Sequence, residues 1–137
     1  MKAIRLPAAL LGALAFGAAL NAAPALTGQK AFAGQALDAE AVKAVLLGKK
    51  VTLGDTRVVI VIAKTSEAQE QFLQRTVGMS TSQFQSHWRR LFMTGGGTAP
   101  KVVENEAEAV AAAAATPGAV AIVEEAKAEG LAILAKS

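Results

Sequence analysis

The hydrophobic pattern predicts alternating helices and strands from residue 37 onward. Apolar residues recur at helical spacing from Leu37 to Leu46, with Asp38 as a candidate N-cap and Gly48 placed to end the helix. The next apolar run, Val58 to Ala63, is rich in β-branched residues and has no polar interruption. Such a run predicts a central strand covered on both faces, as in a parallel sheet.

Two more helices are expected between residues 66 and 92. Ser66 with Gln69 forms a capping-box signature for the first helix, which Gly78 ends. Ser80 or Ser82 is expected to cap the second helix. The apolar face of that second helix is formed by Phe84, Trp88, Leu91 and Phe92.

The C-terminal third predicts one helix and two short strands. Residues 95–100 are rich in glycine and cannot continue a helix. An alanine-rich helix follows, and Pro117-Gly118 ends it. Three acidic residues are expected in its first turns, where negative charge is favourable at the positive end of the helix dipole. They are Glu104, Glu106 and Glu108. Strands are expected at 119–123 and 131–134. The alternation of helices and strands predicts an α/β domain with a mostly parallel sheet flanked by helices.

The first 33 residues have the order of a secretory signal peptide. Lys2 and Arg5 precede an apolar run from Ala8 to Leu20, and small residues follow. The run is too short to span a bilayer, which needs roughly 20 residues. Cleavage is expected between Ala25 and Ala33, with Ala31-Phe32-Ala33 as the favoured motif, so that the domain spans residues 34–137.

This leader predicts export to the periplasm, with no stable membrane anchor after cleavage. The alternative is an uncleaved helix that anchors the chain. The full chain has no cysteine, which excludes disulfides, thiolate metal sites and a lipid anchor on cysteine. Three of its 14 basic residues and none of its 11 acidic residues lie in positions 1–33. The remaining 11 bases therefore balance the 11 acids, and this neutral charge predicts no nucleic-acid partner.

The candidate chemistry gives no positive case for an enzyme. His87 is the only histidine, so a histidine-based triad or a multi-histidine metal site lacks its parts. The glutamates at 104, 106 and 108 are expected to spread around a helix instead of forming a carboxylate pair. We therefore expect a non-enzymatic protein without a metal or cofactor.

Two segments are candidate anion-binding sites. The first is Thr65-Ser66, where backbone N–H groups and hydroxyls meet at a helix start. Simple capping of that helix is the alternative reading. The second is Thr94-Gly95-Gly96, where glycine lets a backbone approach a ligand closely. Its alternative is a flexible connection. Neither segment matches a P-loop or a dinucleotide fingerprint.

A series of landmarks runs through these elements. They are Leu46-Leu47-Gly48-Lys49, Ser66 with Glu70 and Phe72, Val77-Gly78-Met79-Ser80, Trp88 with Leu91, Phe92-Met93-Thr94-Gly95, Pro100, and Pro117-Gly118-Ala119-Val120. With them, the stretch from Leu37 to Leu134 resembles the phosphate-type periplasmic substrate-binding proteins of ABC transporters, and the short single-lobe members most closely. The resemblance implies one lobe of a type II periplasmic-binding-protein-like fold, phosphate or another oxyanion as ligand, and a transporter or envelope protein as partner.

The chain departs from that family where the ligand binds. In full-length relatives the segment matching Lys64 to Phe72 is glycine-rich and supplies serine, threonine and arginine to phosphate. Here Ser66 and Thr65 alone carry over, and residues 60–71 contain neither arginine nor glycine. The usual opening strand is also expected to be absent. The implied activity is therefore weak oxyanion binding, and the alternative is a protein–protein interaction module without a small ligand.

A second resemblance gives a third hypothesis. Residues 74–92, with Gly78 as the turn and Arg89-Arg90 near the end, resemble the second helix-turn-helix of AraC-type transcription regulators. The leader and the neutral charge of residues 34–137 argue against DNA binding. The expected strands at 58–63 and 119–123 have no place in an all-helical pair. The binding-protein hypothesis is therefore preferred.

Overall fold

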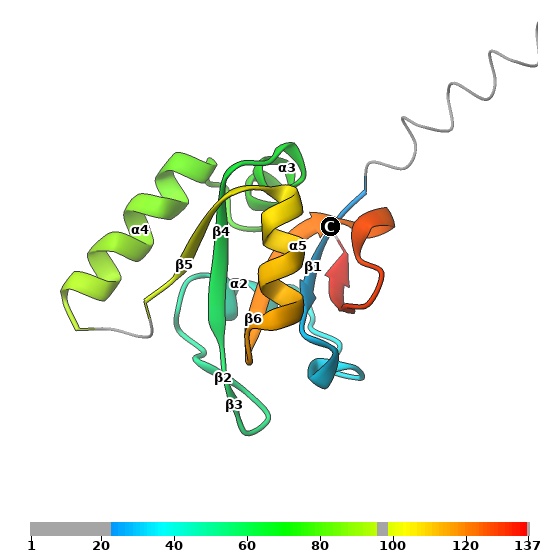
Figure 1. The fold of residues 1–137 in the computed structure, drawn as a ribbon. Helices are drawn as coiled ribbons and strands as arrows, with labels where there is room; N and C mark the ends of the chain where they lie inside the picture. Colours follow the sequence, from blue (N-terminus) through cyan, green and yellow to red (C-terminus); the bar gives the residue numbers. More distant parts are fainter. Residues whose placement is uncertain (1–22, 96–98, 137) are drawn as a thin grey trace, which may run out of the picture.

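The computed structural model describes residues 23–95 and 99–136, which form a five-stranded sheet with helices on both faces (Figure 1). The apolar run of the leader and Gly96 lie outside the described residues. The sheet contains β1 (Pro24–Gly28), β4 (Val59–Thr65), β5 (Lys101–Asn105), β6 (Ala119–Glu124) and β7 (Ala132–Lys136). The other elements are α2 (Ala39–Leu46), α3 (Glu67–Thr76), α4 (Thr81–Met93), α5 (Glu106–Ala115), the hairpin β2 (Thr52–Leu53) and β3 (Thr56–Arg57), and the 3-10 turns η1 (Lys30–Phe32) and η2 (Glu125–Lys127). No helix in this part of the chain is long and apolar enough to cross a bilayer.

The predicted class, an α/β domain with a mostly parallel sheet flanked by helices, is confirmed. The strand order is β5-β4-β6-β1-β7. β4 is parallel to β5 and to β6, whereas β1 is antiparallel to β6 and to β7. Four of the five strands therefore run in one direction, with β1 opposed to them. The strands expected at 58–63, 119–123 and 131–134 correspond to β4, β6 and β7.

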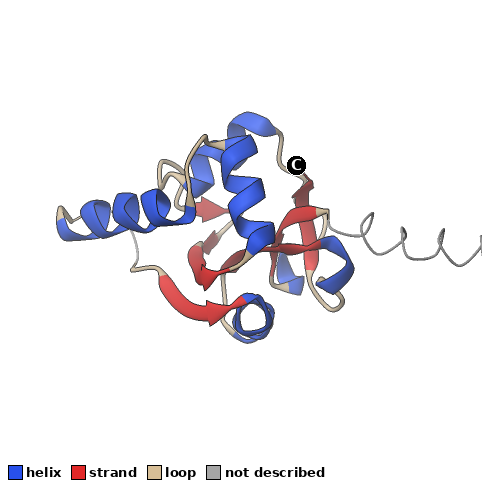
Figure 2. Ribbon diagram, turned by 90° about the horizontal axis from the view of Figure 1, so that it is seen from above, coloured by secondary structure: helices blue, strands red, loops and turns tan. Residues whose placement is uncertain are grey.

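Alternate residues of β4 pack into two hydrophobic layers. Ile60 and Ile62 join the larger cluster, which includes Phe72 of α3 and Trp88 of α4. Val61 points to the opposite face, where it packs with the alanines of α5. Figure 1 shows α5 in front of the sheet and α2 behind it, and Figure 2 shows the same layers from above. The prediction that this strand is covered on both faces is confirmed.

The N-terminal boundary differs from the one expected from the sequence. β1 lies between β6 and β7, and each of its five residues is buried. The hydroxyl of Thr27 donates a hydrogen bond to the carbonyl of Ala121 (2.8 Å), and Phe32 packs into the larger core cluster. The folded domain therefore includes residues 24–33, and an opening strand is present. A domain that starts at residue 34 would lose an interior strand.

The segment before α5 also differs from the expectation. Residues 101–105 form the edge strand β5, and α5 begins at Glu106 with Asn105 as its N-cap. Glu104 therefore lies on a strand and not in the first turn of a helix. The helix pair α3–α4 lies against this sheet, and it belongs to an α/β domain instead of the all-helical pair required by the DNA-binding alternative.

The helix starts follow the expected caps with one exception. Asp38 caps α2, and Ser80 with Gln83 forms a complete capping box on α4. Ser66 accepts a hydrogen bond from the N–H of Gln69 (3.2 Å), but the side chain of Gln69 does not return to Ser66. It is buried and bonds to the backbone of Ala63 instead. The predicted capping box on α3 is therefore only half formed.

The position of β1 predicts which N-terminal truncation the domain tolerates. A chain starting at Ala23 keeps β1 and should unfold cooperatively. A chain starting at Gly34 loses β1 and Phe32, and truncating a buried phenylalanine side chain alone typically costs about 3–5 kcal/mol of a total stability near 5–15 kcal/mol. We expect the shorter chain to show no cooperative transition by circular dichroism. A cooperative transition of similar midpoint in both chains would contradict the role assigned to β1.

The same reasoning applies to export. If the leader is cleaved, the N-terminus of the mature protein should precede Pro24, as intact mass will show. A folded mature protein that begins at Gly34 would contradict this prediction.

Candidate functional site

Two helix starts meet at the edge where the parallel strands end. β4 ends at Thr65 and leads into α3, while the neighbouring β5 ends at Asn105 and leads into α5. Thr65 and Asn105 are register partners. In open α/β sheets ligands bind outside the carboxyl ends of the strands. This edge, which we call the carboxyl edge, is therefore the first place to look for a site, and it contains the predicted residues Thr65 and Ser66.

The hydroxyl of Ser66 and the ammonium group of the adjacent Lys64 are already engaged. The hydroxyl of Ser66 serves as the N-cap of α3. The adjacent Lys64 forms an ion pair with Glu104 (2.9 Å). Thr65 is exposed, and Glu67 follows in the first turn of the helix. A carboxylate in that turn occupies the positive end of the helix dipole and repels an incoming anion.

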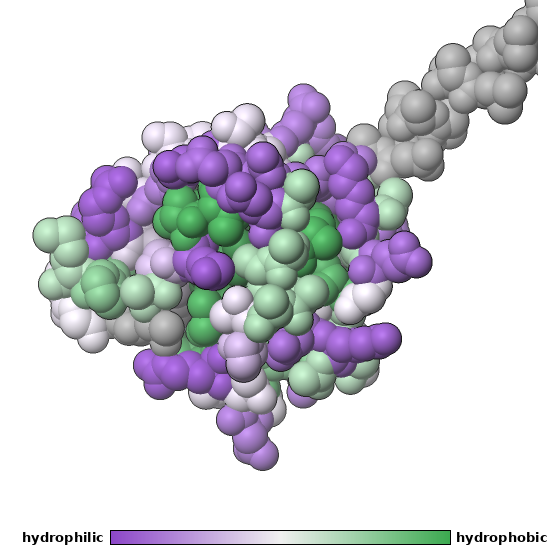
Figure 3. All heavy atoms as spheres, in the orientation of Figure 1, coloured by the Kyte–Doolittle hydropathy of each residue, from purple (hydrophilic) through white to green (hydrophobic). Residues whose placement is uncertain are grey.

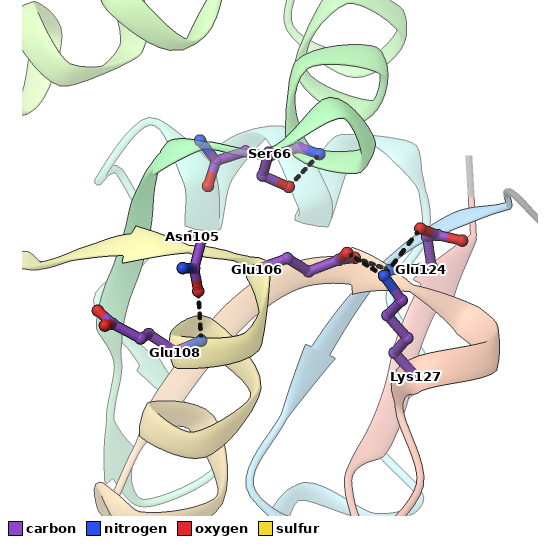
Figure 4. A network of polar contacts seen from close by, with 7 residues as sticks. Ser66, Asn105, Glu106, Glu108, Glu124 and Lys127 are labelled. Carbon is purple, nitrogen blue, oxygen red and sulfur yellow. Dashed lines mark hydrogen bonds and ion pairs between the residues drawn. The ribbon is translucent and has the colours of Figure 1, made fainter.

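The start of α5 is occupied by its own carboxylates (Figure 4). Asn105 accepts a hydrogen bond from the N–H of Glu108 (3.0 Å), and the Glu108 side chain accepts one from the N–H of Glu104 (2.9 Å). Glu106 accepts from the N–H of Glu124 (2.7 Å), so it joins the end of β6 to α5. One backbone donor in the first turn of α5, that of Glu108, is thus taken by its cap, and two carboxylates of that turn lie beside it, bonded to neighbouring strands.

Lys127 is held among the same carboxylates. Its ammonium group lies 2.8 Å from Glu106 and 3.3 Å from Glu124. The hydrogen bond to Glu106 raises the pKa of Lys127 above its usual value, and the bond to Glu124 adds to the effect. Both nearby lysines, Lys64 and Lys127, are thus paired with glutamates. The carboxyl edge is acidic and offers phosphate little attraction.

The second predicted anion site does not join the first. α4 begins near α3, and its C-terminal end lies far from the start of α3 (Figure 1). Thr94 is the C-cap of α4, and its hydroxyl donates toward the carbonyls of Arg90 and Leu91, both at 3.0 Å. Gly95 has a φ of +85° and donates its N–H to Phe92. Gly96 lies outside the described residues. Two of the three predicted residues therefore have a structural role in helix termination.

A different hollow opens between α4 and β5, and we call it the α4–β5 groove. It has a volume of about 450 Å³. Its lining consists of Lys64, Gln85, Trp88, Arg89, Phe92, Ala99, Pro100 and Val102. Two of its large apolar side chains, Phe92 and Val102, are 50% and 49% exposed. Figure 3 shows hydrophobic surface over the C-terminal part of α4 and near β5.

Sequence reasoning missed this groove because it missed β5. Phe92 was assigned to the apolar face of its helix, which implies burial, yet it is half exposed. Val102-Val103, directly after Pro100, is a short β-branched signal for a strand. The glutamates that follow, beginning with Glu104, were assigned to the start of a helix, so no strand was predicted at residues 101–105.

The described residues contain few groups placed for acid–base catalysis or metal binding. The Nε2 atom of His87 lies 2.9 Å from the carbonyl of Leu47, and its ring packs edge-on against Trp88. No group of three histidine, cysteine, aspartate or glutamate side chains within residues 23–95 and 99–136 is placed to hold a metal ion. Comparisons with protein-family models, with characterised proteins and with solved structures gave no match.

The link between α3 and α4 gives a testable pH dependence. Glu70 accepts a hydrogen bond from the N–H of Thr81 (3.1 Å), which lowers the pKa of Glu70 below its ordinary value of 4.5. This bond stabilises the fold above pH 4.5 and is lost as pH falls through the lowered pKa. We expect Glu70→Gln to reduce the free energy of unfolding by about 1 kcal/mol at neutral pH.

The difference between wild type and Glu70→Gln should shrink in urea titrations below pH 4.5. Glu70→Gln keeps an acceptor for the N–H of Thr81 but removes the charge that strengthens this bond. Glu67→Gln is the matched control, because it removes a charge from the same helical turn at a residue that does not accept from Thr81. A difference that stays constant down to pH 3 would contradict the assignment.

The acidic carboxyl edge predicts weak or no phosphate binding. Calorimetric titration of the folded protein with phosphate should give no saturable heat at millimolar concentration. Ser66→Ala should leave the titration unchanged, although loss of the cap costs about 1 kcal/mol of stability. Ser82→Ala removes a hydroxyl elsewhere and serves as the control. A saturable heat that disappears in Ser66→Ala, but not in Ser82→Ala, would restore the anion site.

Proposed function

We propose that this chain is an exported, non-enzymatic α/β domain that works in the periplasm as a protein–protein interaction module. The α4–β5 groove is its contact surface, and a transporter component or another envelope protein is its partner. The observation that carries the proposal is the contrast between two surfaces. The carboxyl edge is filled by caps and paired charges, whereas the groove leaves Phe92 and Val102 half exposed.

We further propose that the domain descends from one lobe of a type II periplasmic-binding-protein-like fold. Several landmarks of the resemblance stand at element boundaries. Gly48 follows α2, Ser66 caps α3, and Pro117-Gly118 precedes β6. Trp88 of α4 lies in the core and donates a hydrogen bond to the carbonyl of Leu46 (2.8 Å). These positions support common ancestry because they determine where elements begin and end.

Weak oxyanion binding, which the resemblance implies, stays a prediction. Ser66 and Thr65 provide hydroxyls at the right end of β4, but four glutamates crowd the same edge. These are Glu104, Glu106, Glu108 and Glu124. A phosphate here would meet negative charge without an arginine to offset it. The interaction module is therefore the better supported of the two activities.

Site-specific photocrosslinking tests the proposed contact surface. A benzoylphenylalanine residue in place of Phe92 lies on the groove, and one in place of Glu67 lies exposed at the carboxyl edge. In cells of the source organism we expect one discrete crosslinked partner from position 92 and none from position 67. A partner captured from position 67 alone, or from neither position, would contradict the proposal.

A further inference from the structure

We infer that the partner supplies an extended strand, acidic and apolar on one face, which pairs with the outer edge of β5 and places that face in the α4–β5 groove. This inference rests on the proposed function and adds the chemistry of the partner. It follows from three properties of the same region: an open strand edge, an apolar hollow beside it, and a cation on the rim that has no partner among the described residues.

The first property is the open edge of β5. This strand ends the sheet, and β4 is its one strand partner among the described residues. The N–H of Glu104 points away from β4, since it bonds to the side chain of Glu108. Backbone groups of alternate residues in a strand point to the same side, so the N–H and C=O of Val102 also point outward. An added strand can pair with them.

The second property is the position of the groove relative to that edge. Ile62 and Val102 are register partners, and Ile62 faces the cluster that contains Trp88. Val102 therefore lies on the same face of the sheet as α4. Every second side chain of an added strand would project onto this face and enter the hollow beside Phe92. One added strand could thus pair with the edge of β5 and bury apolar side chains in the groove at the same time.

The third property is the charge of the rim. Arg89 is exposed and forms no hydrogen bond or ion pair with the described residues. The other cation of the groove, Lys64, is neutralised by Glu104. An acidic side chain on the entering face of the strand could therefore form an ion pair with Arg89. The carboxyl edge would repel the same acid, which directs it to the groove.

A second copy of this chain is the main competing occupant. β5 itself carries Val102 and Glu104 on the groove face, so it has part of the required pattern. That occupant would make a symmetric dimer through two β5 edges. Concentration-dependent dimerisation, detected by sedimentation and abolished by Arg89→Glu, would overturn the proposal in favour of self-association.

Two blocked peptides provide the direct test on the folded full chain. One has the sequence Thr-Val-Thr-Glu-Thr-Val-Thr, and its twin has lysine in the central position. Binding is followed by the fluorescence of Trp88, the sole tryptophan of the chain and a residue of the groove. We expect the glutamate peptide to bind about tenfold more tightly than its twin, as for one favourable charge pair exchanged for one repulsive pair.

The decisive variant is Arg89→Glu, with Arg90→Glu as its matched control. Both residues are exposed on α4, but Arg90 lines a different hollow beside residues 77–79. Arg89→Glu should reverse the preference so that the lysine peptide binds more tightly, while Arg90→Glu should leave the preference unchanged. No fluorescence response up to millimolar peptide, equal binding of the twins, or equal effects of the two variants would overturn the inference.

The outcomes separate this inference from the proposed function. If crosslinking from position 92 succeeds and the peptides show no preference, the module stands and the strand chemistry is wrong. If crosslinking from position 92 also fails, both are wrong.

Discussion

The carboxamide of Gln69 joins the end of β4 to α3 and α4, the two helices that cover it. The α4–β5 groove depends on this contact. The side chain is 1% exposed. It accepts from the N–H of Ala63 and donates to the carbonyl of the same residue, both at 2.9 Å. It also donates to the hydroxyl of Thr81 at the start of α4 (3.2 Å). Without it, each unpaired backbone group of Ala63 would cost about 1–3 kcal/mol.

This contact explains why the α4–β5 groove exists. β4 pairs with β6 at Val59 and Ile60. Further along β4, the N–H and C=O of Ala63 bond to the side chain of Gln69 instead of to a neighbouring strand. Thr81 ties the beginning of α4 to the same point. The helix then runs away from β4 toward its C-terminal end (Figure 1). Phe92 near that end lines the same hollow as Val102 of β5 and stays half exposed. An interior hydrogen-bond network thus sets the shape of an outer surface.

The elements that could be predicted are those with local signals. The caps Asp38 and Ser80 and the β-branched run of β4 each specify structure within a few residues. β1 could not be predicted in this way, because Pro24–Gly28 has no repeating pattern and its partners lie about a hundred residues away. Gln69 shows the competition directly: its sequence position favours a capping box, but the buried groups of Ala63 offer stronger bonds.

The candidate site follows the same division. The place of Ser66 at the end of a strand was predictable, as were the nearby hydroxyl and helix start. The charge around it was not, because Glu106 and Glu124 meet through the sheet and not along the chain. The landmarks of the resemblance therefore describe the framework well, while the ligand depends on contacts between distant segments.

Mapping by amide chemical shifts tests most directly whether the groove, and not the carboxyl edge, is the functional surface. The ¹⁵N-labelled protein is titrated with the glutamate peptide and, separately, with phosphate. The account predicts saturable peptide shifts in residues 88–92 and 101–104, with residues 65–69 and 105–108 unchanged by either compound. Saturable phosphate shifts at 65–69, together with no peptide response along β5, would contradict it.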